Sequence, residues 1–195
     1  LQPRRHLRGA GLPDGGGGGP DRRRRQFRGR RPGLFGLRRL AAAGHTVWLV
    51  HRRPEVVGAI QRHGLHLVTP TDDLRIPLHA TLETSTIGQV DLVLVTTKSS
   101  DTRPAAEAAR PLVGPQTIVL TLQNALGNLE TIAEVLGSEH AVLGMTYLGA
   151  AVRGPARVEL TAAGSTFIGE PNGDLSGRIV NLARTLSAAE VPTEA

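Results

Sequence analysis

No cysteine occurs among the 195 residues. This absence excludes a disulfide framework, a cysteine-ligated zinc cluster and a thiol nucleophile. The sequence also lacks an apolar run of about 18 residues, the length that a transmembrane helix needs. Its basic start lacks the apolar segment that follows the basic region of a secretory signal. From these absences we expect a cytoplasmic protein that does not enter a membrane.

Lysine is nearly absent as well, because Lys98 is the single lysine among the 23 basic residues. The formal net charge of +6 suggests nucleic-acid binding until it is mapped along the chain. Residues 1–33 hold ten arginines against Asp14 and Asp21, so the rest of the chain is slightly acidic. The basic excess therefore belongs to the first segment alone.

Branched aliphatic residues are scarce in residues 1–33, which contain the runs GGGGG and RRRR. A segment of this kind cannot bury enough apolar surface to offset its ordering entropy, so we interpret it as disordered. A basic arm for nucleic acid is disfavoured because Phe27 is its only aromatic residue. A further alternative is that the segment does not come from the native reading frame.

From Leu34 onward the sequence alternates between helical and strand patterns. Apolar residues at helical spacing end at Gly44, and the run TVWLV that follows indicates a buried strand. Pro54 and Gly64 bound the next helix, with proline in its first turn and glycine beyond its end. LHLVTP and LRIPLHAT then predict short strands. This order indicates an α/β fold.

The second half of the chain continues the alternation. Residues 126–136 carry an apolar helical stripe that starts at Leu126 and is closed by Gly137. AVLGMTYLGA, RVELTA and STFIGEP predict three strands, and GDLSGRIVNLARTLSAAE predicts a closing helix. We expect residues 34–190 to form one Rossmann-type domain with a mostly parallel sheet, which the strands between residues 140 and 170 extend or flank.

Two strands lie between Asp91 and Asn128, DLVLVTTK and TIVLTLQ, and their unbroken apolar character predicts burial on both faces. Asp101 is expected to cap the intervening helix. Lys98 follows the first strand and Asn124 the second. Ligands bind at the carboxyl ends of parallel strands, so we expect both side chains to face one crevice. Taken singly, each could equally be a solvent-exposed lysine or a turn asparagine.

A dinucleotide site needs a Gly-rich turn between a strand and a helix N-terminus. RPGLFG places Gly33 and Gly36 in the last two positions of G-x-G-x-x-G, with Arg31 in the first. The preceding RRRRQFRGR cannot be a buried strand, because its guanidinium groups would lack partners. The first βα unit is therefore incomplete. The two glycines are cofactor-binding candidates, and close helix packing is the alternative.

His51, Arg52 and Arg53 follow the TVWLV strand. In a Rossmann domain an acidic residue at this place binds the adenosine ribose of NAD, whereas an arginine accommodates the 2′-phosphate of NADP. The two arginines therefore favour NADP over NAD. A solvated charge pair at a strand end is the alternative.

The ordered motifs of the chain resemble one family. They are TTKSSDT at 96–102, LQNALGN at 122–128, GMTYLGA at 144–150 and TFIGEP at 166–171. Together they resemble ketopantoate reductase (2-dehydropantoate 2-reductase), and the resemblance spans roughly residues 34–190. The family is similar in fold to other Rossmann dehydrogenases followed by an all-helical domain. It reduces ketopantoate to pantoate with NADPH on the way to coenzyme A.

The resemblance implies roles for particular residues. Arg52 would contact the 2′-phosphate of NADPH, and Lys98 and Asn124 would contact the cofactor near the substrate. Asn124 would also hydrogen-bond the substrate, and Ala150 would lie against the cofactor. Ala125 departs from the glycine common in the family, which alters backbone freedom more than chemistry.

The resemblance also has two gaps. The family's first strand and Gly-rich turn should precede Leu34, so we hypothesise a shifted reading frame or misassigned start over about the first 35 residues. The family's general-acid lysine comes from the helical domain, which we expect this chain to lack. Lys98 does not replace that lysine, because it matches a position on the cofactor side. We therefore expect no catalytic residue and little or no activity in this chain.

The sequence thus predicts a truncated NADPH-dependent reductase of a 2-oxo acid, with ketopantoate as the expected substrate and no metal. One alternative is a non-catalytic remnant that binds a nucleotide or a partner. Another is a reductase of a different 2-oxo acid. The oligomeric state is not predicted.

Overall fold

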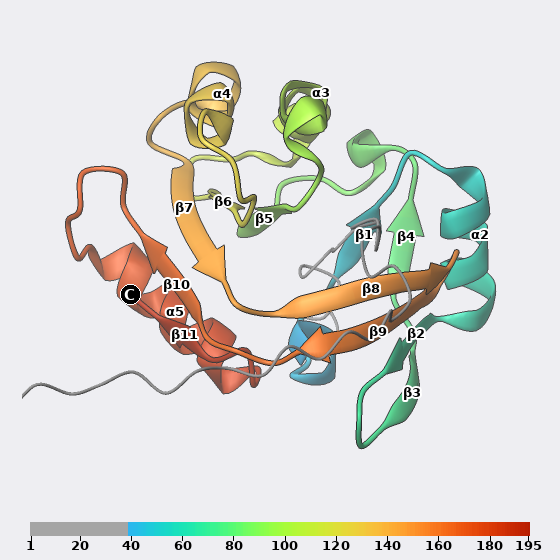
Figure 1. The fold of residues 1–195 in the computed structure, drawn as a ribbon. Helices are drawn as coiled ribbons and strands as arrows, with labels where there is room; N and C mark the ends of the chain where they lie inside the picture. Colours follow the sequence, from blue (N-terminus) through green and yellow to red (C-terminus); the bar gives the residue numbers. More distant parts are fainter. Residues whose placement is uncertain (1–38) are drawn as a thin grey trace, which may run out of the picture.

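The computed structural model describes residues 39–195, in which helices and strands alternate (Figure 1). The α/β class expected from the sequence is confirmed. The interpretation of residues 1–33 as disordered and the glycine turn at Gly33 and Gly36 lie outside the described residues. Residues 39–42 are helical, and the labelled helices are α2 (Pro54–His63), α3 (Thr102–Ala109), α4 (Asn128–Leu136) and α5 (Gly177–Ala188). Short 3-10 turns are η1 (Thr84–Thr86), η2 (Ser99–Asp101) and η3 (Arg110–Leu112).

A five-stranded sheet forms the centre of the fold, with the order β11-β10-β7-β6-β5. Its strands are β5 (Leu92–Val95), β6 (Ile118–Thr121), β7 (Ala141–Thr146), β10 (Thr166–Gly169) and β11 (Thr193–Glu194). The first three are parallel to one another, and β10 runs antiparallel to β7. The parallel part confirms the Rossmann-type arrangement.

Helices cover both faces of this sheet (Figure 1). Successive residues of a strand point to opposite faces, and β6 shows the result. Val119 packs in one apolar cluster with Ile132 of α4 and Ala106 of α3. Its neighbour Leu120 packs in the other cluster with Ile179 of α5. Both strand residues are completely buried, which explains why the sequence of β6 is apolar throughout.

The remaining strands form two further sheets. β1 (Trp48–Val50) pairs in parallel with β4 (His79–Thr81). The other sheet has the order β3-β2-β9-β8 and contains β2 (Leu65–Val68), β3 (Asp73–Ile76), β8 (Gly149–Gly154) and β9 (Arg157–Ala162). Its strands β2 and β9 are parallel and come from opposite ends of the described chain. The strands between residues 140 and 170 thus both extend the central sheet and flank it.

Strand β5 differs from its expected burial. Within residues 39–195 it pairs only with β6 and therefore ends the five-stranded sheet. Val95 is buried, but Leu92, Val93 and Leu94 are only half-buried. Leu92 and Leu94 pack against one apolar cluster and Val93 against the other, so both faces of the strand are covered as expected. Their burial is incomplete because β5 has a neighbouring strand on one edge only.

Glycine positions explain two helix boundaries. Gly64 ends α2 with a φ of +70°, and a Cβ there would lie 2.5 Å from the carbonyl oxygen of Ile76. The expected end of this helix is confirmed. Gly127, with a φ of +84°, precedes α4, so the helix begins at Asn128. Leu126 lies before the helix and is fully exposed, and its assignment to the apolar stripe is wrong.

One expected strand is divided in two. AVLGMTYLGA becomes β7 and β8, which separate at Tyr147 and Leu148 and enter different sheets. On β7, Leu143 and Met145 are exposed, and Met145 stands opposite the exposed Phe167 of β10. The Tyr147 ring meets Phe167 edge-on at 6.3 Å between centroids. These side chains give the sheet an apolar surface that the described helices leave open.

Candidate functional site

The carboxyl ends of β5 and β6 bring Lys98 and Asn124 to the same edge of the central sheet. Val95 and Thr121 are register partners in this parallel pair. Lys98 and Asn124 each lie three residues beyond their partner, and both side chains are exposed. The shared placement that the sequence suggested is therefore present, and both polar groups are accessible to a ligand.

Gln123 connects the two loops that carry these residues. Its Nε2 donates to the Thr97 carbonyl oxygen at 3.0 Å and to the Thr102 hydroxyl at 2.9 Å. Its Oε1 accepts from the Thr121 hydroxyl at 3.0 Å. The Gln123 side chain at the end of β6 thus fixes the loop after β5, because it donates hydrogen bonds to Thr97 and Thr102 on either side of that loop.

Asn128 adds a second connection at the start of α4. Its Oδ1 accepts a hydrogen bond from Thr102 at 2.8 Å, and its Nδ2 donates to the Ala125 carbonyl oxygen at 2.7 Å. Nδ2 also lies 3.3 Å from the Ser99 hydroxyl. Thr102 and Asn128 are 2% and 4% exposed. Their side-chain polar atoms form hydrogen bonds inside the protein, so the loops are anchored by buried, paired polar groups.

Arg52 reaches the same region from the end of β1. Its side chain is 72% exposed, and Nη1 lies 3.3 Å from Oδ2 of Asp101 on the Lys98 loop. The expectation that Asp101 caps α3 through its side chain is wrong. Asp101 occupies the N-cap position, but its carboxylate makes no capping hydrogen bond. The carboxylate faces Arg52 instead, and this pair joins the loop after β1 to the loop after β5.

Ala150 is placed differently from the other candidates. It lies in β8, opposite Leu160 of β9, and is 1% exposed. Its methyl group packs in the main apolar cluster. Contact between Ala150 and a cofactor stays a prediction.

Ala125 occupies its loop without strain. Among the described residues, Glu190 is the non-glycine residue with a positive φ, so Ala125 has an ordinary backbone conformation. Replacing a glycine by alanine is unfavourable where φ is positive, and that condition is not met here. The departure from the family pattern at this position is therefore compatible with the loop geometry.

The polar network below the loops was not found in the sequence. Gln123, Thr102 and Asn128 lie in the motifs quoted above, but nothing in their spacing shows which of them is buried. A usable signal was present in one place. Asn128 begins an amphipathic helix, where a polar residue needs a partner if it is buried.

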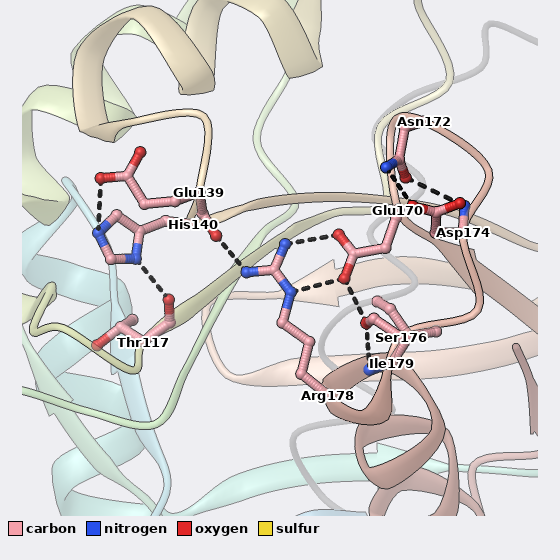
Figure 2. A network of polar contacts seen from close by, with 9 residues as sticks. All are labelled: Thr117, Glu139, His140, Glu170, Asn172, Asp174, Ser176, Arg178 and Ile179. Atoms are coloured by element: carbon pink, nitrogen blue, oxygen red, sulfur yellow. Dashed lines mark hydrogen bonds and ion pairs between the residues drawn. The ribbon is translucent and has the colours of Figure 1, made fainter.

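A second polar network lies away from this edge, between α5 and the turn before β7 (Figure 2). Arg178 donates from Nε to Glu170 Oε1 at 2.7 Å and from Nη2 to Oε2 at 2.5 Å. It also donates to the carbonyl oxygen of Glu139. Ser176 adds a 2.5 Å hydrogen bond to Oε1. The Arg178 guanidinium holds the pKa of Glu170 below its usual value. All these groups are paired, which indicates a structural role.

Other kinds of site are not evident in the described part of the chain. Residues 39–195 contain no group of three or more metal-ligating side chains. None of their helices is both long and apolar enough to span a bilayer. A surface hollow beside the carboxyl end of α2 is lined by Arg62, His63, Arg75 and His79. Arg52 lies near the opposite, amino end of this helix. No acidic residue from the described part of the chain lines this hollow, and we assign it no site.

Comparisons with known proteins place the geometry in context. The profile of a family described as ketopantoate reductase PanE/ApbA matches residues 33–173. The 2-dehydropantoate 2-reductase of Aquifex aeolicus is 31% identical over 158 residues, covering 79% of this chain and 49% of that protein. The corresponding enzyme of Halobacterium salinarum is 34% identical over 157 residues, covering 79% and 51%. The chain spans about half the length of the curated relatives it matches.

Solved structures give the same picture. The 2-dehydropantoate 2-reductase of Geobacter metallireducens matches with a TM-score of 0.78 and 32% identity, covering 85% of this chain and 55% of that one. A ternary structure of D-mandelate dehydrogenase with NADH and anilino(oxo)acetate also has a TM-score of 0.78. It is 25% identical and covers 83% of this chain and 53% of that one. The fold is thus shared by a 2-dehydropantoate 2-reductase and by a D-mandelate dehydrogenase.

Proposed function

The chain belongs to the ketopantoate reductase family, and on this premise we propose that it forms the NADPH-binding part of an enzyme that reduces ketopantoate to pantoate. Residues 34–190 are the nucleotide-binding domain in this proposal. Arg52, Lys98 and Asn124 bind and orient the cofactor, and Asn124 also contacts the substrate. We assign none of the three the role of the proton donor.

The observation that carries the proposal is that the loops after β1, β5 and β6 come together. Lys98 and Asn124 follow paired strands in the same register, and the Arg52–Asp101 pair ties the end of β1 to the Lys98 loop. Nucleotide cofactors of Rossmann domains bind outside the carboxyl ends of the strands. The arrangement therefore supports a dinucleotide that extends from Arg52 toward Asn124.

The residues also fit the charges of NADPH. The exposed Arg52 guanidinium can donate two parallel hydrogen bonds to a 2′-phosphate. Lys98 is exposed, and it makes no ion pair with any residue from 39 to 195, so its ammonium can act as a point charge for a phosphate or carboxylate. Bound NADPH supplies the hydride that reduces the keto carbon. The contribution of Asn124 is orientation, since its amide both donates and accepts.

A different 2-oxo acid is a second candidate substrate. The similarity to D-mandelate dehydrogenase, whose structure holds anilino(oxo)acetate, favours it. The same edge serves both candidates, because a hydride donor and an amide that hydrogen-bonds a 2-oxo acid are common to them. NADH in that structure makes the choice of cofactor part of the test.

Calorimetric titration of the purified 195-residue chain with NADPH and with NADH tests the cofactor assignment. We expect NADPH to bind more tightly. Arg52→Gln should weaken NADPH binding about 10- to 100-fold, because charge-assisted hydrogen bonds contribute about 1.5–3 kcal/mol. NADH binding should stay nearly constant. Arg53→Gln is the matched control, since Arg53 is similarly exposed and lies 4.0 Å from Glu55.

Equal losses in Arg52→Gln and Arg53→Gln would show that general charge, rather than Arg52, attracts the cofactor. Failure of both NADPH and NADH to bind would reject the nucleotide-binding role. The substrate is tested by adding ketopantoate or phenylglyoxylate, the 2-oxo acid related to mandelate, to the NADPH complex. The one that tightens NADPH binding or oxidises NADPH is the substrate, and an effect of phenylglyoxylate alone would reject ketopantoate.

A further inference from the structure

The pairing of Arg52 with Asp101 has no evident role in folding. Asp101 stands at the N-cap of α3, where a carboxylate normally accepts hydrogen bonds from the first backbone N–H groups. Its side chain makes none of these bonds and lies 3.3 Å from the Arg52 guanidinium instead. Arg52 is 72% exposed and Asp101 32%. Exposed ion pairs of this kind add little to stability. The Asp101 carboxylate thus makes a weak contact in place of a stabilising helix cap.

The position of the carboxylate matters for any ligand of Arg52. A 2′-phosphate on the guanidinium would bring a nearly doubly negative group close to the negative charge of Asp101. Like charges within a few ångströms repel, and the guanidinium donors that now face Asp101 would have to be shared or surrendered. An unphosphorylated ribose would meet no such repulsion, because its hydroxyl groups are neutral and can donate to a carboxylate.

We propose that Asp101 is a specificity-determining residue that reduces the preference of the site for NADPH over NADH, by holding the Arg52 guanidinium and repelling the 2′-phosphate. This inference rests on the proposed function. Arg52 favours the phosphorylated cofactor, and Asp101 opposes it from the neighbouring loop. The ratio of the two affinities is then set by a pair of residues that the fold brings together from β1 and α3.

The test is Asp101→Asn, measured by titration with NADPH and with NADH. Asparagine has the same shape, carries no charge and is an equally good N-cap, so α3 stays intact. We expect NADPH affinity to rise about three- to ten-fold, which is the effect expected from removing one solvent-exposed negative charge near the phosphate. NADH affinity should stay equal or fall. The gain in NADPH affinity should shrink at about 1 M salt, where the Debye screening length is only about 3 Å.

Glu107→Gln is the matched control, because it removes one negative charge from the exposed face of the same helix near the end remote from Arg52. It should change neither affinity. A fall in NADPH affinity in Asp101→Asn would overturn the proposal, since it would mean that Asp101 presents Arg52 to the phosphate. An equal change with NADPH and NADH, or no change, would also overturn it. Failure of the unmodified chain to bind either cofactor would instead reject the proposed function.

Discussion

The hydroxyl of Thr102 donates a hydrogen bond to Oδ1 of Asn128 at 2.8 Å, and this contact joins the first turn of α3 to the first turn of α4. Both residues are almost fully buried. The same hydroxyl accepts from Gln123 at 2.9 Å. The loops that present Lys98 and Asn124 are therefore fixed from below by one small set of paired polar groups.

Thr102→Val should lower the free energy of unfolding by about 1–3 kcal/mol, because it leaves the buried Oδ1 of Asn128 without its donor and removes one of the hydrogen bonds of Gln123 Nε2. Chemical denaturation measures this loss. Thr185→Val is the control, since Thr185 is exposed on α5 and bonds only to its own helix, at the Asn181 carbonyl oxygen. That variant should change stability by less than about 0.5 kcal/mol. Equal midpoints for the two variants would mean that the network contributes no stability.

Lys98→Gln should weaken NADPH binding about ten-fold and leave the unfolding free energy nearly unchanged, because the exposed ammonium pairs with a phosphate rather than with the protein. Titration with NADPH and denaturation of the same sample give both quantities. Arg110→Gln removes an exposed cation at the far end of α3 and should affect neither. A drop in stability alone would assign Lys98 to the fold and not to the cofactor.

Glu170→Gln should change how stability depends on pH. The pKa of Glu170 is lowered from 4.5 in the folded state, mainly by the hydrogen bonds from Arg178. The ionised form is therefore favoured by folding, and its contribution is complete above pH 4.5 and lost as the pH falls through the lowered pKa. At neutral pH we expect the variant to lose about 1–2 kcal/mol, a modest value because Arg178 is 36% exposed.

Denaturation at several pH values down to the acid range tests this difference. The stability curves of the unmodified chain and Glu170→Gln should converge as the pH falls below 4.5. Glu130→Gln, which removes an exposed carboxylate from the first turn of α4, should run parallel to the unmodified chain. Curves that stay separated in acid would show that the loss comes from packing and not from the ionised pair.

Gly64→Ala should destabilise the protein by at least about 2 kcal/mol, because an L side chain is strained at positive φ and the new Cβ meets a backbone oxygen. The Cβ would lie 2.5 Å from the carbonyl oxygen of Ile76. Gly177→Ala is the matched control, since a Cβ there meets nothing within 4 Å. Thermal unfolding compares the two, and a neutral Gly64→Ala would mean that the turn after α2 can rearrange.

The sequence predicted features that depend on neighbouring residues. Pro54 and Gly64 bound α2 as expected, because their effect on the backbone is local. Lys98 and Asn124 came to one edge because two parallel strands in register carry them there. The division of one expected strand at Tyr147 was missed, because both halves are equally apolar and only their different pairing partners separate them.

Long-range contacts were also missed. The Arg52–Asp101 pair joins two loops distant in sequence, and the capping pattern of α3 pointed to a different role for Asp101. Leu126 was assigned to α4 because it continues an apolar spacing, a local error, since Gly127 has a positive φ and the helix begins only at Asn128. Local patterns cannot predict the Arg52–Asp101 pair, since it depends on a contact between segments that are distant in the sequence.

The parallel pairing of β2 with β9 has a consequence for the order of assembly. His66–Val68 align with Arg157–Glu159, so forming this pair closes a loop of about ninety residues, at a large entropic cost. During synthesis β2 and β3 emerge early and can form a hairpin, which is only marginally stable in water by itself. β5, β6 and β7 are joined by short helical crossovers and can pair as they emerge. β2 therefore keeps an unpaired edge until β9 has been made, long after β5, β6 and β7 have paired, and β10 and β11 then complete the five-stranded sheet.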